Sequence, residues 1–434
     1  MPFAGFVLPA LILRPGLETA LGLVHMNLGP ISVTLGFLFN IMMVAIAAAL
    51  AGYALLVDRR YQAPLATVAL VWSPYLFGNL IAAFHSPQPA MAIQVLFNGL
   101  TYASVSYLAL SYAPSIDRAM LTKGVALTAV LPLLTGLVQI ATGTAGPRLQ
   151  ASFAHPNILA FFLLIVITFL VHALVQGYVR SRSWVVAIAV ILVVGGLEVL
   201  LTGTRSAYIA TYIAIFLYLL WRRPVLILLM LALPFVALTI PAVSDRIQDV
   251  FNGSTPVSYD YIVSAMRGDV SDSGQIMLDS GTWRKYLWKA AWPWIENKFM
   301  FGHGLVSFQL YSREFFPLAA EEGSGAHNIY VQMLFEGGVL LFLGYVVTYI
   351  GVIVMHLCRM KTSAADSYYA ILLMMVFAVA SFSDNMLYYL SVNIMMWGVV
   401  FVLLASKRSE SVTSSLRTDR PRPFALAGGL SRRP

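Results

Sequence analysis

The sequence is poor in cysteine and in charge. Cys358 is the single cysteine among 434 residues, so no disulfide can form within the chain and no thiolate cluster can hold a metal. Only 11% of the residues are charged, 59% are hydrophobic, and the mean hydropathy is +0.80. A soluble domain of this composition would expose large apolar patches to water. The composition therefore predicts a membrane protein that crosses the bilayer several times.

Several motifs that carry chemistry are also missing. The chain has no Walker A motif, no GxGxxG after a strand and no nucleophile elbow. It has no HExxH, DxD or Cys pair, and His25, His85, His172 and His356 do not stand at ligand spacing. We therefore expect no metal site and no cofactor. The net charge of +8 fits basic residues that mark cytoplasmic loops, so we expect no nucleic-acid partner.

Apolar stretches of about 18 to 25 residues can cross a bilayer as helices. The run 368–405 is too long for one crossing, and the polar stretch SFSDNM at 381–386 divides it in two. A weaker span lies within 3–22, and its apolar run has no basic residue before it, so we expect it to be retained rather than cleaved as a signal. About twelve spans result, the others lying near 31–57, 63–84, 91–112, 119–142, 157–179, 184–202, 204–221, 224–242 and 328–356.

The basic residues set the predicted orientation. With the N-terminus inside, ten Lys and Arg residues fall in short cytoplasmic segments and seven in the tail, which is 17 of the 27 in the chain. The short outer segments hold only Arg148 and, at an edge, Arg205. This asymmetry follows the positive-inside rule, so we expect a cytoplasmic C-terminus.

Four segments follow from this topology. Residues 1–242 hold the first nine spans, and 327–405 hold the last three. Between them, 243–326 has the mixed composition of a soluble segment and is predicted to form an outer loop domain. Within it, 283–298 (WRKYLWKAAWPWIENK) spaces aromatic and basic residues as an amphipathic helix does, with Pro293 interrupting it late. The tail 406–434 is polar and basic, and we expect it to be disordered.

Polar stretches gather on the outer face that the cytoplasmic charges define. Each stretch falls at the end of a span or in the long loop, so together they predict a site for the polar headgroup of a lipid. The stretches are RLQASFAHPNILA (148–160), LTGTRSAYIA (201–210), SGTWRKYLW (280–288), FGHGLVSF (301–308), GSGAHNIY (323–330) and SFSDN (381–385), which bring His155, Arg205, Arg284, His303, His327 and Asp384 to one rim.

Two arginines are candidates to bind a diphosphate. Arg205 lies in a turn between two spans, and Arg284 opens the predicted amphipathic helix. A guanidinium stays charged and matches phosphate oxygens with two parallel hydrogen bonds. Arg205 could instead snorkel at the interface or pair with Glu198, seven residues earlier. Arg313 is a weaker candidate for the same work, as are Lys285 and Lys289.

Each histidine of this face could also have a purely structural role. His327 and Asn328 stand at the start of a span, where they could cap the helix, or His327 could take a proton from an attacking hydroxyl. His155 precedes Pro156 and Asn157, which is typical of a helix start.

Two further polar residues are interpreted differently. His303 lies between two glycines in a predicted turn, and its structural and functional interpretations stay open. Glu336 falls inside a span, where burying an acid is costly, so it needs a partner that the sequence does not identify. Nine residues put it on the helical face opposite His327, and we interpret it as a structural residue.

These motifs, in this order, resemble the O-antigen ligase and polysaccharide polymerase superfamily of bacterial inner-membrane glycosyltransferases. The resemblance rests on SFAHPNILA, LTGTRSAYIA, the run from SGTWRKYLW to FGHGLVSF, and AHNIYVQMLFEGG, between about 148 and 344. It implies an all-α membrane bundle of about twelve spans with a large, partly helical periplasmic loop.

The resemblance also implies an activity, which is glycan transfer from undecaprenyl diphosphate to an acceptor hydroxyl at the periplasmic face, with inversion and without a metal. In such enzymes the basic residue after the TG(S/T) turn and the arginine of the loop helix bind the diphosphate, and the histidine of the HN motif acts in catalysis. The predicted catalytic residues are thus His327, Arg205 and Arg284. The predicted substrate-binding residues are Arg205, Arg284, His155, Asn157, His303, Asn328 and Arg313.

A polymerase and a ligase of this superfamily would differ in the acceptor that receives the glycan. A polymerase of O-antigen or exopolysaccharide type would use another lipid-linked glycan, whereas a ligase would use a sugar of the lipid A core. We favour the polymerase. A transporter or flippase is a less favoured alternative, because transporters place polar groups near the bilayer midplane, and a membrane protein that binds a partner through its loop is a third.

Overall fold

A computed structural model describes residues 14–17, 21–22, 24–28, 31–239, 244, 264, 280–316, 318–319 and 322–405. Most of the predicted first span and the whole tail 406–434 lie outside these residues, as does most of 243–279. The described part is almost entirely helical, which agrees with the predicted fold class, and it includes one two-stranded hairpin. Arg14–Leu17 forms a short 3-10 turn, η1.

Each of the other eleven predicted spans contains a helix. Among the described residues, seven helices are long and apolar enough to cross a membrane by length and composition, and the helices of 224–235, 364–380 and 390–405 are apolar but shorter. The total of twelve spans stays a prediction. The helices are α3 (Leu35–Leu56), α4 (Gln62–Phe84), α5 (Pro89–Tyr112), α6 (Arg118–Thr142), α7 (Pro156–Gln176), α8 (Arg182–Leu201), α9 (Arg205–Arg222), α10 (Ile227–Leu238), α15 (Ile329–Arg359), α16 (Ala364–Ala380) and α17 (Leu390–Ala405).

The second span begins later than predicted, because a hairpin precedes it. Strands β1 (His25–Leu28) and β2 (Ile31–Thr34) pair antiparallel, so residues expected to open the helix are extended. Thr34 ends the strand and caps α3, since its hydroxyl accepts from the Phe37 N–H at 3.1 Å. The β-branched residues of the ISVT stretch favour the strand over the helix.

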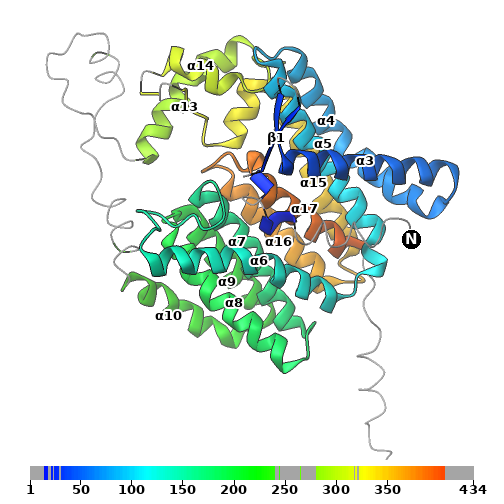
Figure 1. The fold of residues 1–434 in the computed structure, drawn as a ribbon, viewed down its shortest axis with the longest axis vertical. Helices are drawn as coiled ribbons and strands as arrows, with labels where there is room; N and C mark the ends of the chain where they lie inside the picture. The colour runs from blue at the N-terminus through cyan, green and yellow to red at the C-terminus, as the bar shows by residue number, and fades with distance from the viewer. Residues whose placement is uncertain are drawn as a thin grey trace, which may run out of the picture.

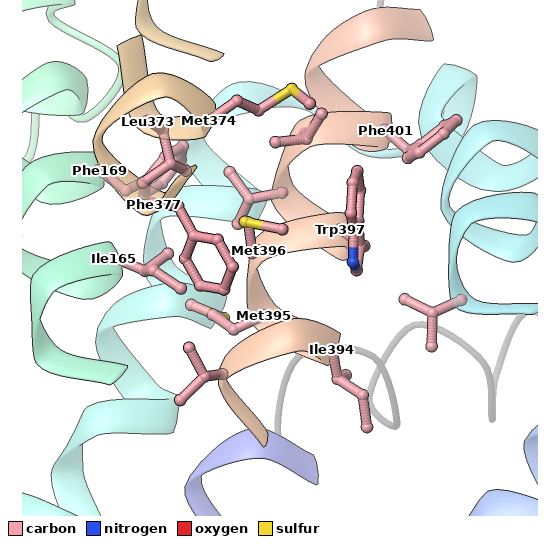
Figure 2. Close-up of a cluster of buried hydrophobic side chains, with 14 of the residues drawn as sticks. Ile165, Phe169, Leu373, Met374, Phe377, Ile394, Met395, Met396, Trp397 and Phe401 are labelled. Atoms are coloured by element: carbon pink, nitrogen blue, oxygen red, sulfur yellow. The ribbon is translucent and has the colours of Figure 1, made fainter. Parts of the chain in front are cut away.

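The centre of the bundle is formed by α7 and α17, which are buried along most of their length. Figure 2 shows Met396 of α17 beside Phe377 of α16, and Leu373 of α16 beside Phe169 of α7, while Trp397 projects from the other side of α17. Buried apolar side chains on all sides of these two helices explain why their sequences show no polar face.

Helix α15 is broken where the sequence predicts one continuous span. Gly338 has φ 61° and ψ −164°, which no helix contains. The chain around residues 299–304 docks on the break, with the Val339 N–H donating to Phe299 O and the Gly304 N–H to Glu336 O, both at 2.8 Å. A Cβ on Gly338 would overlap the Met300 backbone, so glycine is required for the approach as well as for the dihedral angles.

The described part of the predicted loop domain therefore sits directly on the broken helix. The helices within this part are α13 (Ser280–Asn297) and α14 (Ser307–Phe315). Figure 1 shows these two helices together at the top of the view, far from α8 and α10 at the bottom. The predicted amphipathic helix is present, but it continues through Pro293 to Asn297 rather than being interrupted there.

Candidate functional site

The two ends of the bundle hold different polar groups. At one end, the first residues of α7, α9 and α15 meet the turn that follows α16. At the other end, Arg118 pairs with Asp366, and Asp366 also contacts His172 and Tyr178. The short segments that the positive-inside rule assigns to one side thus meet at one end, and the predicted site residues lie at the opposite end.

A closed ring of contacts surrounds the candidate site. Going round it, Arg205 donates to Ser280 at 3.1 Å, and three residues further along α13 the Trp283 ring lies 5.8 Å from the His327 ring. His327 faces Asp384, Asp384 accepts from the Asn157 amide, and Thr204 beside Arg205 donates to Asn157 Oδ1 at 3.1 Å. Five separate segments of the chain therefore converge on one place.

Arg148 holds the turn that carries Arg205 in place through hydrogen bonds. The sequence did not predict this role of Arg148. Its guanidinium donates to Thr202 O at 2.7 Å, to Asn157 Oδ1 at 2.6 Å and to Thr204 Oγ1 at 3.0 Å. Gly203 in this turn has φ 65°, and a Cβ there would lie 3.3 Å from Arg148 Nε. The one available signal was that Arg148 is a basic residue in a short outer segment, where such residues are rare.

Arg284 follows Trp283 in α13, and its charge interacts with those of Asp384 and Arg205. Burial lowers the pKa of Arg284, Asp384 acts against this by attraction, and the positive charge of Arg205 lowers the pKa further. The two guanidinium groups therefore repel each other across the site, and a bound polyanion would relieve that repulsion. Both carboxylate oxygens of Glu198 lack a hydrogen-bond partner among the described residues and lie against Gly136, so the predicted alternative of a Glu198–Arg205 hydrogen bond is not seen.

His327 is held in a strained conformation against a carboxylate. Its φ is 48°, which a residue with a side chain adopts rarely. Its Nδ1 lies 3.6 Å from Asp384 Oδ1, and its side chain is 41% exposed while that of Asp384 is 3% exposed. Burial alone would raise the pKa of Asp384, but the His327 and Tyr389 side chains together hold that pKa below its usual value. Asp384 is therefore a charged group at neutral pH.

His155 caps α7, as the helix-start pattern of residues 155–157 predicts. Its Nδ1 accepts from the Asn157 N–H at 3.1 Å, so the single N–H proton of the neutral imidazole is on Nε2. Burial lowers the pKa of His155, and attraction by Asp384 only partly offsets this effect. Asn157 is occupied at both ends of its amide, so it connects the Arg148 turn to Asp384.

Asn328 is also a capping residue. Its Oδ1 accepts from the Tyr330 N–H at 3.0 Å and from the Val331 N–H at 3.3 Å, which starts α15. Its own N–H donates to Asn385 Oδ1 at 3.2 Å. Asn328 thus fixes the helix start beside His327 rather than reaching into the ring.

Two predicted site residues lie elsewhere. His303 is buried between α13 and α15, where it stacks on Phe335 at 4.7 Å between ring centroids and its Nε2 lies 2.9 Å from Trp294 O. Burial lowers its pKa. Arg313 is exposed in the last turn of α14. The structure does not bring either residue to the ring around His327.

The arrangement combines an anion-binding pair with a proton acceptor. Two guanidinium groups can neutralise a phosphate without a metal. An imidazole whose Nδ1–H faces a carboxylate keeps Nε2 free to accept a proton. Within the described residues, no three His, Cys, Asp or Glu side chains are grouped so that they could ligate a metal ion.

Fold and site together define a helical membrane protein with a polar, doubly cationic site where several helices end. Residues 188–346 match the sequence model of a family described as O-antigen ligase. The resemblance predicted from the motifs is confirmed, since this segment is similar to the O-antigen ligase and polysaccharide polymerase superfamily. No curated protein matches the chain.

The matched segment covers only part of the ring. It begins in α8, ends in α15, and includes Arg205, Arg284 and His327. Arg148, Asn157 and Asp384 lie outside it, and they enter the site through the fold.

Proposed function

We propose that the chain transfers a glycan from undecaprenyl diphosphate to the hydroxyl of an acceptor sugar, with inversion and without a metal. The observation that carries the proposal is that Arg205, Arg284 and His327 border one ring of contacts at one end of the bundle. The match to the O-antigen ligase family supports the same class of reaction.

The arginines bind the leaving group. The bond that breaks joins the anomeric carbon of the sugar to a diphosphate oxygen, and negative charge grows on that oxygen as the bond opens. Arg205 and Arg284 neutralise this charge, and they do so most strongly where burial excludes water. The departing lipid stays in the bilayer, which is why a site at the ends of membrane helices suits this donor.

His327 takes the proton of the acceptor. The acceptor oxygen attacks the anomeric carbon from the side opposite the diphosphate, and its proton passes to His327 Nε2. Asp384 faces Nδ1 at 3.6 Å, so its negative charge stabilises the imidazolium that forms. The diphosphate leaves as an anion, and the proton then passes from His327 to water.

The proposed location follows from the charges at the two ends. The end with Arg118, Arg222 and Arg359 carries the basic segments and is assigned to the cytoplasm, and the ring is assigned to the periplasmic face of a bacterial inner membrane. The partners are then membrane lipids, an undecaprenyl-diphosphate-linked glycan as donor, and a glycan or the lipid A core as acceptor.

We favour a polymerase of O-antigen or exopolysaccharide type, and the family description keeps the ligase as the alternative. The purified protein is incubated with a defined undecaprenyl-diphosphate glycan, with and without lipid A core. A ladder of longer lipid-linked products without core supports the polymerase. A single adduct that forms only with core supports the ligase, and no transfer in either case contradicts the proposed function.

A transporter is the class that this site supports least. A transporter holds its substrate near the bilayer midplane, whereas the ring lies at helix ends. Reconstituted vesicles separate the two classes: movement of the lipid-linked glycan across the bilayer without new glycosidic bonds would favour the transporter.

A further inference from the structure

Glu336 is a buried acid in α15 that is hydrogen-bonded to three segments of the chain through its carboxylate and its backbone carbonyl. It is 1% exposed, and the site derived above does not include it. Gln332 Nε2 donates to its Oε1 at 2.5 Å, and the Tyr388 hydroxyl donates to its Oε2 at 2.9 Å. The Gly304 N–H donates to the Glu336 backbone carbonyl at 2.8 Å, which ties in the segment between α13 and α14.

The first arm of this network reaches the residue before His327. Gln332 donates to Glu336 through its amide nitrogen, and its amide oxygen accepts from the Ala326 N–H at 2.9 Å. Because His327 has a positive φ, its conformation persists only where the neighbouring backbone is held. Glu336 orients the Gln332 amide, and that amide holds the backbone of Ala326, the residue before His327.

The second arm reaches the turn that carries Asp384. Tyr388, which donates to Glu336, lies four residues after Asp384, and its N–H donates to Asn385 O at 3.0 Å. Asn385 in turn accepts from the N–H of Asn328, the residue after His327. One carboxylate is thus connected to both sides of the His327–Asp384 pair.

We propose that Glu336 is a positioning residue that sets the separation of His327 and Asp384. The proposal rests on the proposed function, in which that pair accepts the proton of the acceptor. Glu336 itself contacts neither residue of the pair, so it acts through Gln332 and Tyr388 rather than by exchanging protons with substrate. Loosening either arm moves the base relative to its carboxylate, and misplacement of about 1 Å at a reacting centre can cost about a hundredfold in rate.

The test compares Glu336→Gln and Tyr388→Phe with Tyr349→Phe. Tyr349 is a matched control, because it is also buried, lies on α15 and donates one hydrogen bond, to Met374 O at 2.5 Å, away from the ring. With purified protein and a lipid-linked donor, we expect the two network variants to lose about ten- to hundredfold in kcat with an unchanged KM for the donor. The control is expected to keep its kcat within about twofold of the natural chain.

A double-mutant cycle separates positioning from a general structural role. In an Asp384→Asn background, Glu336→Gln should cost less than about twofold further, because there is no longer a charge to position. An equal loss in both backgrounds, or no loss in the natural background, overturns the proposal. Where Glu336→Gln does not accumulate in the membrane, Tyr388→Phe in the same cycle gives the answer.

Failure of this proposal is distinguishable from failure of the proposed function. If His327→Ala keeps full transfer, the function assigned to the ring is wrong. If His327→Ala is inactive while Glu336→Gln and Tyr388→Phe are fully active, only the positioning role is wrong.

Discussion

His327 Nδ1 lies 3.6 Å from Asp384 Oδ1, although 57 residues separate the two in the chain. The distance is just beyond that of a hydrogen bond and within that of an ion pair. The Asp384 carboxylate is buried and its pKa is lowered, whereas the His327 imidazole is partly exposed. This pair is the feature that most directly links the fold to proton transfer.

Replacing the carboxylate should impair turnover more than donor binding. We expect Asp384→Asn to lower kcat roughly a hundredfold, because the imidazolium formed in the reaction loses its counter-charge. The KM for the donor should stay within about threefold, since the arginines are intact. Steady-state kinetics with purified protein measure both values. Unchanged kcat would show that Asp384 has no part in the reaction.

The arginine pair should act through the diphosphate. Arg205→Ala and Arg284→Ala are each expected to lower kcat/KM about a hundred- to a thousandfold, and lysine at either position should restore only part of the loss, because an ammonium cannot form the two-pronged contact. Lys298→Ala, an exposed cation of the same loop domain, is the control and should have little effect. Equal losses for the control and the arginines would point to nonspecific attraction instead.

The break in α15 should tolerate no side chain. Gly338→Ala puts a Cβ into the Met300 backbone and forces a non-glycine residue into dihedral angles that cost about 1 to 3 kcal/mol before any clash is counted. We expect a clear loss of thermal stability in detergent and of protein level in the membrane. Gly196→Ala in α8 is the matched control, since a Cβ there meets nothing within 4 Å. Similar unfolding temperatures for the two variants would contradict the docked-loop description.

Acid should weaken the helix cap at His155. The pKa of His155 in the folded protein is lowered below its usual value of 6.5. A histidine with a depressed pKa contributes stability that is complete above the unfolded pKa and is lost as the pH falls through the folded one. We therefore expect unfolding temperatures to fall between about pH 7 and pH 5, and His155→Asn, a cap that does not titrate, to reduce this fall. The same pH dependence in both proteins would assign the effect to another group.

Most helices, and the grouping of several polar stretches at one end of the bundle, could be predicted from the sequence. Apolar runs of fixed length and the placement of Lys and Arg are local signals, and they led to α3–α10 and α15–α17 within a few residues. The helix start at His327 and Asn328 was also local, because a capping residue precedes an apolar run.

The rest depends on contacts that sequence spacing does not encode. The Gly337–Gly338 pair gave no sign of a break, because the break is completed by the backbone of residues 299–304. His303 had turn residues on both sides, yet its ring is taken up by Phe335 and Trp294. Asp384 was expected on the outer rim, but its place beside His327 and Asn157 appears only in the fold. Arg148 enters the site only when the ends of α6 and α8 are brought together in space.

The most direct measurement is a single turnover of purified protein on an undecaprenyl-diphosphate glycan, with donor binding followed separately. His327→Ala should bind the donor as the natural chain does and form product at least about a hundredfold more slowly. Product formation at the natural rate by His327→Ala, with the protein folded and the donor bound, would contradict the account.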